Sequence, residues 1–271
     1  MASPEFVIPA DRLPPGFAET LDRPPANVVE PKPAATVVML RDADDGMEVL
    51  LLKRHRSSGF VPGAYVFPGG RTDDADGNPQ LVGHVTHLPT IHLPLQFWFA
   101  AVREVFEEAG VLMARNRDGE WVADTTTDEE LEGWRLKLMS EEATLLDVVQ
   151  DTQYMIDFSG IVYFAHWITP EAEPRRYDTH FFAAVVPPGR TARPDPREMT
   201  DALWLRPAAA LERFDVGQLP MVFPTIRTLQ QLAPYQTTEE TYAAIRARPV
   251  EPILPRLIRT EGGVGIVIDP K

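Results

Sequence analysis

Apolar residues recur with a helical period over residues 95–109, and no other segment shows the pattern as clearly. The apolar side chains fall three or four positions apart, so a helix gathers them on one side. Glu104, Glu107 and Glu108 share the opposite side, within about 100° of arc. Gly110 follows, and glycine suits the left-handed position that ends a helix. The pattern predicts a helix with one buried face and one acidic face.

Runs of β-branched and aromatic residues predict the strands. Two runs, 36–40 and 48–54, flank the turn residues 44–46 and predict a hairpin whose loop is longer than the tightest type. A third run, 63–70, ends in a proline and a glycine pair. Two more strands are predicted at 161–168 and 179–186.

Helices are predicted in two further parts of the chain. Residues 115–157 are predicted to be mostly helical, with one helix over 129–138 and another over 141–149. A later set of helices runs from Pro207 to about Arg246. Strands around one acidic helix, with helices added later, are typical of a mixed α/β domain.

Charge and composition limit the partners. The net charge is −14 at pH 7, so neither nucleic acid nor an anionic membrane is an expected partner. A small anionic substrate stays open, because bound metal ions can reverse the local sign. The absence of cysteine excludes disulfides, thiolate metal sites and cysteine nucleophiles. No apolar run approaches the ~18 residues that span a bilayer, and the start has no secretory pattern, so a cytoplasmic protein is expected.

The acidic helix face is the strongest chemical signal. Like charges at helix positions i, i+3 and i+4 cost about 0.2–0.5 kcal/mol per pair. Mg²⁺ or Mn²⁺ turns that cost into binding energy, because hard cations prefer clustered carboxylate oxygens. Such an ion also bridges phosphate oxygens and activates water for pyrophosphate hydrolysis. A lone glutamate pair is usually a solvated face, but the longer pattern Arg-Glu-x-x-Glu-Glu at 103–108 weakens that reading.

The same residues carry a family resemblance. Residues 103–111 match the second half of the Nudix signature, Gly-x5-Glu-x7-Arg-Glu-U-x-Glu-Glu-x-Gly-U, in which U is aliphatic. Gly70 stands where the first glycine would be. The chain therefore resembles the Nudix hydrolase family, and the resemblance implies an α/β/α sandwich with a mixed β-sheet.

The resemblance also implies roles for individual residues. Glu104, Glu107 and Glu108 would bind two or more Mg²⁺ or Mn²⁺ ions, and Arg103 would hold the carboxylates by an ion pair. Glu104 is the first choice for the base that acts on the attacking water, with Glu198 as its rival or as a solvated loop acid.

Four residues outside this helix are candidates for substrate binding. The glycine turn, Gly69 and Gly70, would bring backbone groups towards the metal cluster. Arg54 belongs to a partial match with the pattern of coenzyme A hydrolases. Arg176 precedes a strand, where a guanidinium could grip phosphate, or could equally pair with acidic neighbours on the surface.

The signature is interrupted in this chain. Asp76 stands where glutamate is expected, and 26 residues separate it from Arg103 instead of seven. This puts the role of Asp76 in doubt more than the roles of the glutamates. His84, His87 and His92 lie in the insertion, and solvent-facing or substrate-rim positions are favoured over a metal site for them.

The interrupted box resembles the Nudix branch that includes peroxisomal coenzyme A diphosphatases. That branch implies hydrolysis of coenzyme A or its esters to 3′,5′-ADP and a phosphopantetheine product. An ADP-ribose or dinucleotide pyrophosphatase is the alternative enzyme. A Nudix-fold nucleotide sensor without activity is the alternative of another class.

Three regions are expected along the chain. Residues 1–33, with eight prolines, form an arm that wraps the domain or a partner subunit, or lies loose. Residues 34–211 form the Nudix domain, with an inserted loop at about 77–94 and a helical insertion at about 115–157. Residues 212–271 extend the same domain. A homodimer is possible.

Overall fold

The chain forms two compact units. The computed structural model describes residues 3–23, 27–55, 62–122, 129–194 and 199–269. The larger unit comprises Ala34–Phe164 and Phe181–Pro249, and the smaller unit comprises Met1–Pro33, Ala165–His180 and Val250–Lys271. This division differs from the predicted one, since the last 22 residues group with the N-terminal arm rather than with the preceding helices.

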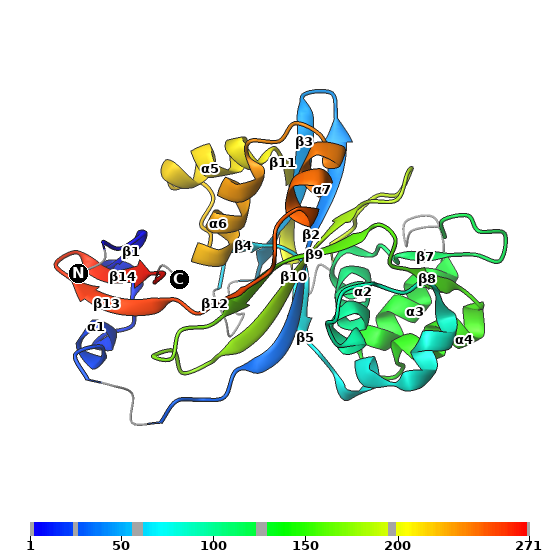
Figure 1. Ribbon diagram of the computed structural model, residues 1–271, viewed down its shortest axis with the longest axis horizontal. Helices are drawn as coiled ribbons and strands as arrows, with labels where there is room; N and C mark the ends of the chain where they lie inside the picture. Colours follow the sequence, from blue (N-terminus) through cyan, green and yellow to red (C-terminus); the bar gives the residue numbers. More distant parts are fainter. Residues whose placement is uncertain (1–2, 24–26, 56–61, 123–128, 195–198, 270–271) are drawn as a thin grey trace. The chain divides into compact units, whose positions relative to one another are not determined.

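A mixed β-sheet forms the centre of the larger unit (Figure 1). Its strands follow the order β11 (Met199–Leu205), β3 (Gly46–Arg54), β2 (Lys32–Ala43), β10 (Tyr177–Val185) and β9 (Ile161–Ile168). Strands β9 and β10 continue past the boundary, so one end of each belongs to the smaller unit. Strand β11 was not predicted, because the polar residues Thr200 and Asp201 interrupt its apolar pattern near the start.

The first hairpin is tighter than its sequence predicted. The pairing of β2 with β3 continues to Ala43 and Gly46, which leaves a two-residue turn. Arg41 stands opposite Glu48 in this register, and its Nη2 lies 2.6 Å from Glu48 Oε2. Cross-strand pairs of opposite charge stabilise a ladder without any apolar pattern. This explains why the strands extend beyond their apolar runs.

The predicted strand at 63–70 is divided in two. Strand β4 (Tyr65–Val66) pairs with β3, and β5 (Gly69–Arg71) pairs with β2. Pro68 lies between them, and proline has no N–H to donate to a ladder. Its carbonyl still accepts a hydrogen bond from Val37 N, at 2.8 Å.

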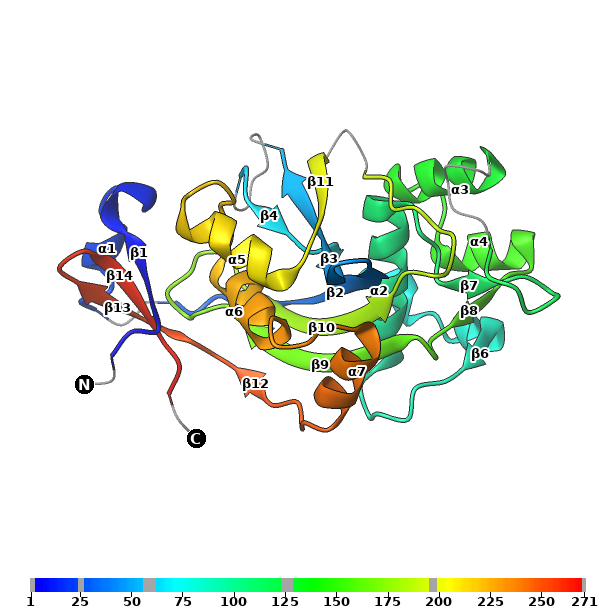
Figure 2. The ribbon, with the colours of Figure 1, turned by 90° about the horizontal axis from the view of Figure 1, so that it is seen from above.

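Helices cover both faces of the sheet in the larger unit, which confirms the α/β/α sandwich (Figures 1 and 2). Helix α2 (Leu95–Ala109) lies on one side, together with α3 (Glu129–Met139) and α4 (Leu145–Thr152). The other side carries α5 (Pro207–Asp215), α6 (Phe223–Leu232) and α7 (Thr238–Arg246).

Helix α4 begins later than the predicted residue 141. Glu141 has φ 60°, a left-handed conformation that interrupts a helix. The true start is fixed by Thr144, whose Oγ1 accepts a hydrogen bond from Asp147 N while its own N–H donates to the Asp147 carboxylate. This reciprocal capping box satisfies donors that a helix end otherwise leaves unpaired.

The inserted segment is more ordered than a loop. It follows the 3-10 helix η2 (Asp74–Gly77) and contains the 3-10 helix η3 (Pro79–His84) and strand β6 (Val85–His87). Strand β6 pairs in parallel with β8 (Met155–Asp157), which also pairs with β7 (Ala114–Arg115). The segment predicted as mostly helical therefore begins and ends in strands.

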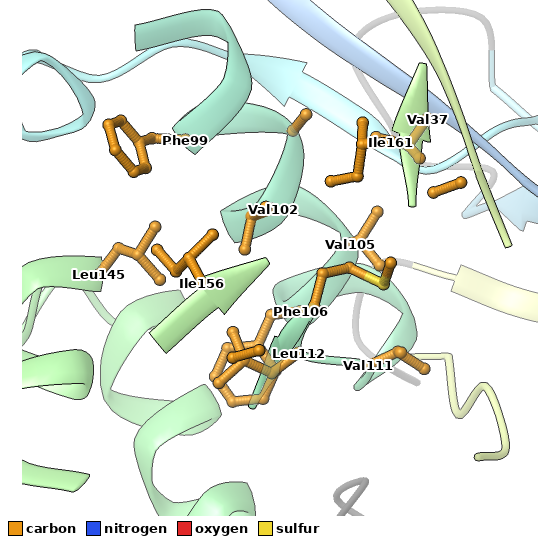
Figure 3. Packing of buried hydrophobic residues seen from close by; sticks show 14 of the residues in the cluster. Val37, Phe99, Val102, Val105, Phe106, Val111, Leu112, Leu145, Ile156 and Ile161 are labelled. Atoms are coloured by element: carbon orange, nitrogen blue, oxygen red, sulfur yellow. The ribbon is translucent and has the colours of Figure 1, made fainter. Parts of the chain in front are cut away.

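The core of the larger unit is built on the apolar face of α2. Val102, Val105 and Phe106 project from the helix into a cluster that includes Leu145 and Ile156 (Figure 3). All these side chains are almost completely buried. This packing fixes the rotation of α2 and so directs its acidic face.

The smaller unit joins the two ends of the chain. Strand β1 (Phe6–Pro9) pairs with β14 (Gly263–Val267), which pairs with β13 (Arg256–Thr260). Helices η1 (Ala10–Arg12) and α1 (Phe17–Thr20) follow β1, and β12 (Pro252–Ile253) pairs in parallel with the end of β9. The arm is thus partly a strand of its own chain's sheet. Among the described residues, no helix is long and apolar enough to cross a membrane.

Candidate active site

Helix α2 presents the predicted glutamates, and its bounds agree with the prediction. The helix ends at Gly110, which has φ 70° and donates its N–H to Phe106 O at 3.0 Å. Only glycine adopts this left-handed conformation without strain, so the chain turns away immediately after Glu107 and Glu108.

Arg103 is the centre of the cluster. Its Nε and Nη2 donate to the two oxygens of Asp76 at 3.0 and 2.9 Å, which is a bidentate pair. Its Nη1 donates to Glu104 Oε1 at 2.9 Å and to Glu107 Oε2 at 3.2 Å. Nη2 also donates to Arg71 O at 2.8 Å. One guanidinium therefore holds three carboxylates and the end of β5 together.

Asp76 has a clear structural place despite the interrupted signature. Its side chain is 1% exposed, and its Oδ2 also accepts a hydrogen bond from Asp73 N at 2.8 Å. The 26 residues between Asp76 and Arg103 form a loop that returns to the start of α2, so the two side chains still meet. The shorter carboxylate serves to hold Arg103.

The glycine turn lies against the glutamates. Gly69 N donates to Glu108 Oε2 at 2.9 Å. A Cβ on Gly70 would stand 2.7 Å from Glu104 Oε2, closer than real Cβ atoms come to other atoms. Any side chain at this position would therefore push Glu104 away, which accounts for the glycine pair before the acidic helix.

The cluster holds more negative charge than its arginine offsets. Burial raises the pKa of Glu104 to about 8, even though Arg103 favours the ionised form. Burial also raises the pKa of Glu107. Burial by itself lowers the pKa of Arg103, but Asp76, Glu104 and Glu107 raise it above its usual value. One cation faces three carboxylates, and such a surplus is relieved by binding another cation.

The donor set fits a hard divalent cation. Glu104, Glu107 and Glu108 offer carboxylate oxygens from one helix face, next to a backbone turn. Mg²⁺ and Mn²⁺ prefer such oxygen ligands over nitrogen or sulfur. The identity and number of the ions stay predictions.

The other predicted site residues are placed differently. Arg176 is buried in the smaller unit, where Nε donates to Thr169 O at 3.0 Å and Nη1 to Val29 O at 2.7 Å. These bonds hold backbone segments together. The sequence had predicted either phosphate binding or a surface ion pair with acidic neighbours. Arg54 ends β3, and its N–H donates to Ala64 O. Substrate binding by both arginines stays a prediction, and Glu198 lies outside the described residues.

The histidines of the insertion have separate environments. His87 Nδ1 lies 3.1 Å from Asp157 Oδ1, so this side chain joins β6 to β8. His84 is partly buried at the end of η3, and His92 is exposed.

Arg135 is a part of the site that sequence reasoning missed. Its side chain is buried, and Nε donates to Glu107 O at 2.9 Å while Nη2 donates to Arg193 O at 2.9 Å. It binds a carbonyl in the last turn of α2, where a cation is favourable. A lone arginine in the predicted helix 129–138 gave no signal of this contact.

Comparison with known proteins agrees with this geometry. The family model described as the NUDT19 Nudix domain matches residues 84–232, more than half of the chain. The acyl-coenzyme A diphosphatase NUDT19 of Gallus gallus is 27% identical over 249 residues, which cover 75% of this chain and 66% of that protein. The Homo sapiens protein of the same name is 26% identical over 264 residues, covering 81% and 70%. The chain thus matches about two thirds of the length of these relatives.

A solved structure shares the fold. A Nudix hydrolase from Alicyclobacillus acidocaldarius superposes with a TM-score of 0.71 at 26% identity, covering 82% of this chain and 100% of that one. The family match includes the whole segment from Arg103 to Gly110, whose side chains form the cluster. The chain therefore belongs to the Nudix hydrolases, as a member with a NUDT19-type Nudix domain.

Proposed function

We propose that this protein is a metal-dependent pyrophosphohydrolase that cleaves coenzyme A or acyl-coenzyme A. The observation that carries the proposal is the largely buried cluster in which Arg103 binds Glu104 and Glu107, while Glu108 binds the glycine turn. The names of the similar animal proteins support the substrate. The reaction adds water across the P–O–P bond, so one phosphate gains the hydroxyl and the other leaves as a phosphate ester.

Each part of the cluster has a task in this reaction. Mg²⁺ or Mn²⁺, when bound, neutralises phosphate charge and makes water more acidic. Glu104, Glu107 and Glu108 would supply its oxygen ligands, and Arg103 holds the first two of them. Asp76 and Arg71 O hold Arg103 in place. The rigid set is ready before substrate arrives, which reduces the reorganisation that the reaction requires.

Proton removal from the attacking water requires a base. Glu104 is our first choice, because its carboxylate lies in the acidic cluster directly against the glycine turn. Glu198 is the rival candidate. Three further expectations come from the sequence alone. They are a nucleotide-type small-molecule substrate, a cytoplasmic location and a homodimer.

A substrate panel tests the proposal. Coenzyme A, acetyl-coenzyme A, ADP-ribose, NADH and diadenosine polyphosphates are offered with Mg²⁺ or Mn²⁺, and products are separated by chromatography. We expect 3′,5′-ADP from the coenzyme A compounds. AMP from ADP-ribose alone would keep the chemistry and overturn the substrate. Tight metal-dependent binding without any product would favour a sensor.

Matched variants test the site. Glu107→Gln and Glu108→Gln should each lower kcat by at least about 100-fold, because each removes a charged ligand. Glu130→Gln is the control, since it removes an exposed glutamate from helix α3. Wild-type turnover in both site variants would contradict the mechanism.

A further inference from the structure

A cluster of nitrogen and oxygen ligands lies within the smaller unit. His166 belongs to β9, and Asp178 and His180 belong to β10. One ligand atom from each residue can be chosen so that all three lie within 4.8 Å of one another. The proposed hydrolytic mechanism uses none of these residues.

Strand geometry explains why the three side chains meet. Thr169 N donates to Tyr177 O at 3.0 Å, which pairs the ends of β9 and β10. Continuing this antiparallel pairing sets His166 opposite His180. Asp178 precedes His180 by two positions, so both side chains point to the same face. A directly opposite pair and a diagonal neighbour are close enough to interact.

The contacts agree with this register. The imidazole rings of His166 and His180 stack, with centroids 4.2 Å apart and planes at 22°. His166 Nε2 is hydrogen-bonded to Asp178 Oδ1, and His180 Nε2 lies 4.0 Å from the same oxygen. Both Nε2 atoms therefore lie within 4.0 Å of one carboxylate oxygen.

We propose that His166, Asp178 and His180 bind a borderline transition ion, of which Zn²⁺ is the type. Zn²⁺ takes histidine nitrogens and a carboxylate oxygen at about 2.0–2.2 Å, which sets tetrahedral ligands roughly 3.3–3.6 Å apart. The observed separations reach this spacing by side-chain shifts of about 1–1.5 Å. The ion takes the place of the hydrogen bond between His166 Nε2 and Asp178 Oδ1.

Exposure within the cluster leaves room for a fourth ligand. The side chain of His180 is 8% exposed and that of His166 is 16% exposed, so both imidazoles are largely shielded from water. Asp178 is 34% exposed and opens the cluster to water. Water entering there supplies the remaining coordination position.

The ligand chemistry separates this site from the glutamates of α2. Two imidazoles favour Zn²⁺, Co²⁺ or Ni²⁺, whereas an all-carboxylate set favours Mg²⁺ or Mn²⁺. We expect the ion to join β9 to β10 within the smaller unit. Because the ion would bind the folded protein and not the unfolded chain, it would also raise the free energy of unfolding.

Cobalt absorption tests the proposal on the full-length protein. The protein is stripped with a chelator and titrated with Co²⁺ in excess Mg²⁺, and the strong visible bands of tetrahedral nitrogen-ligated Co²⁺ are recorded. We expect one such Co²⁺ per chain. His166→Ala and His180→Ala should each weaken binding by at least about tenfold. Zn²⁺ should raise Tm in the wild type and not in these variants.

Controls keep the site distinct from the hydrolytic one. His92→Ala removes an exposed histidine, and Glu108→Gln impairs the carboxylate cluster; both should keep the cobalt bands. Asp178→Asn, which preserves size, is checked by circular dichroism and decides the case if a histidine variant does not fold. Absence of the bands in the wild type, or equal bands in His166→Ala and Asp178→Asn, would overturn the proposal.

Discussion

Arg103 shows how one buried side chain organises a site. It is paired bidentately with Asp76 and reaches Glu104 and Glu107 with its remaining nitrogen. Removing one partner of a buried ion pair leaves the other short of its hydrogen bonds. Loss of a partner of Arg103 therefore affects more than one contact, because the same guanidinium is hydrogen-bonded to two proposed metal ligands, Glu104 and Glu107.

Asp76→Asn should therefore impair metal binding without removing any ligand. We expect Mn²⁺ affinity to fall by about 10–100-fold, as for other residues that orient metal ligands. Isothermal titration with Mn²⁺ measures this independently of the substrate. Asp74→Asn, at an exposed position two residues earlier, is the control. Equal affinities in the two variants would show that Asp76 does not position Arg103.

Glu104 gives the metal-free protein a pH dependence. Its pKa is about 8 in the folded state, whereas the ordinary value is 4.5, so between these values the folded state holds a proton that the unfolded state has lost. The free energy of unfolding then falls as pH rises, by up to about 1.36 kcal/mol per pH unit. This loss begins above pH 4.5 and is complete above about pH 8.

Chemical denaturation of the wild type and of Glu104→Gln, both in the presence of a chelator, isolates the contribution of Glu104 to the pH dependence of the free energy of unfolding. Titrating groups far from Glu104 behave alike in the two proteins, so their contributions cancel. The wild type should lose stability relative to the variant as pH rises from 4.5 to about 8. Saturating Mn²⁺ should reduce the loss, because the ion replaces the proton. Parallel profiles without metal would contradict the raised pKa.

The acidic residues were predictable individually, but their supports were not. Helical periodicity alone placed Glu104, Glu107 and Glu108 on one face, and the observed α2 has the predicted bounds. The contact from Arg135 arises between segments about 30 positions apart, where no periodic pattern connects them. The pairing of His166 with His180 depends on strand register, which the sequence does not fix by itself.

Among the elements, the small sheet beside α2 depends on one buried acid. Asp157 has a completely buried side chain and is bonded to Arg115 from β7 and to His87 from β6. It also accepts a hydrogen bond from Ser159 N at 2.8 Å. Burial by itself would raise the pKa of Asp157, but the bonds from Arg115 and Ser159 outweigh it and lower the pKa to about 2. The stability that these bonds give is present above pH 3.8 and is lost as pH falls through about 2.

Arg115→Ala should destabilise the fold by about 3 kcal/mol, since it leaves a buried carboxylate without its cation. Urea denaturation at neutral pH measures the loss. Arg117→Ala removes an exposed arginine two residues away and is the control. The double variant Arg115→Ala/Asp157→Asn should lose less than the sum of its single variants. Strict additivity would mean that the ion pair contributes no coupling.

The elements also show where pattern reading ends. Strands with apolar runs were found, but β11 and the polar end of β2 are held by pairing with β3. Helix α4 was predicted to begin at residue 141, whereas the capping box at Thr144 sets its start. Local caps and cross-strand partners therefore override average propensity.

For the whole molecule, the unexpected feature is the joining of the two chain ends. Residues 1–33 were predicted as an arm from their prolines, and the final residues as an extension of the main domain. Strand β14 instead lies between β1 and β13, with Val264, Ile266 and Val267 buried. Pairing between segments about 250 positions apart leaves no local signal, because it depends on where the rest of the fold brings the ends.

Deleting residues 1–9 tests this pairing. Without β1, the N–H and C=O groups of one edge of β14 lose the partners that they have between Phe6 and Pro9. Amide exchange in Gly263–Val267 should quicken by at least about tenfold, which corresponds to about 1.4 kcal/mol of local stability. Mass spectrometry of peptides covering this strand measures the change, with peptides from Leu95–Ala109 in the larger unit as the internal control.

If only the β14 peptides change, the ends form a separately opening unit. If α2 exchanges faster as well, the two units unfold together and the terminal sheet supports the site. Unchanged exchange in β14 would mean that β1 does not protect it.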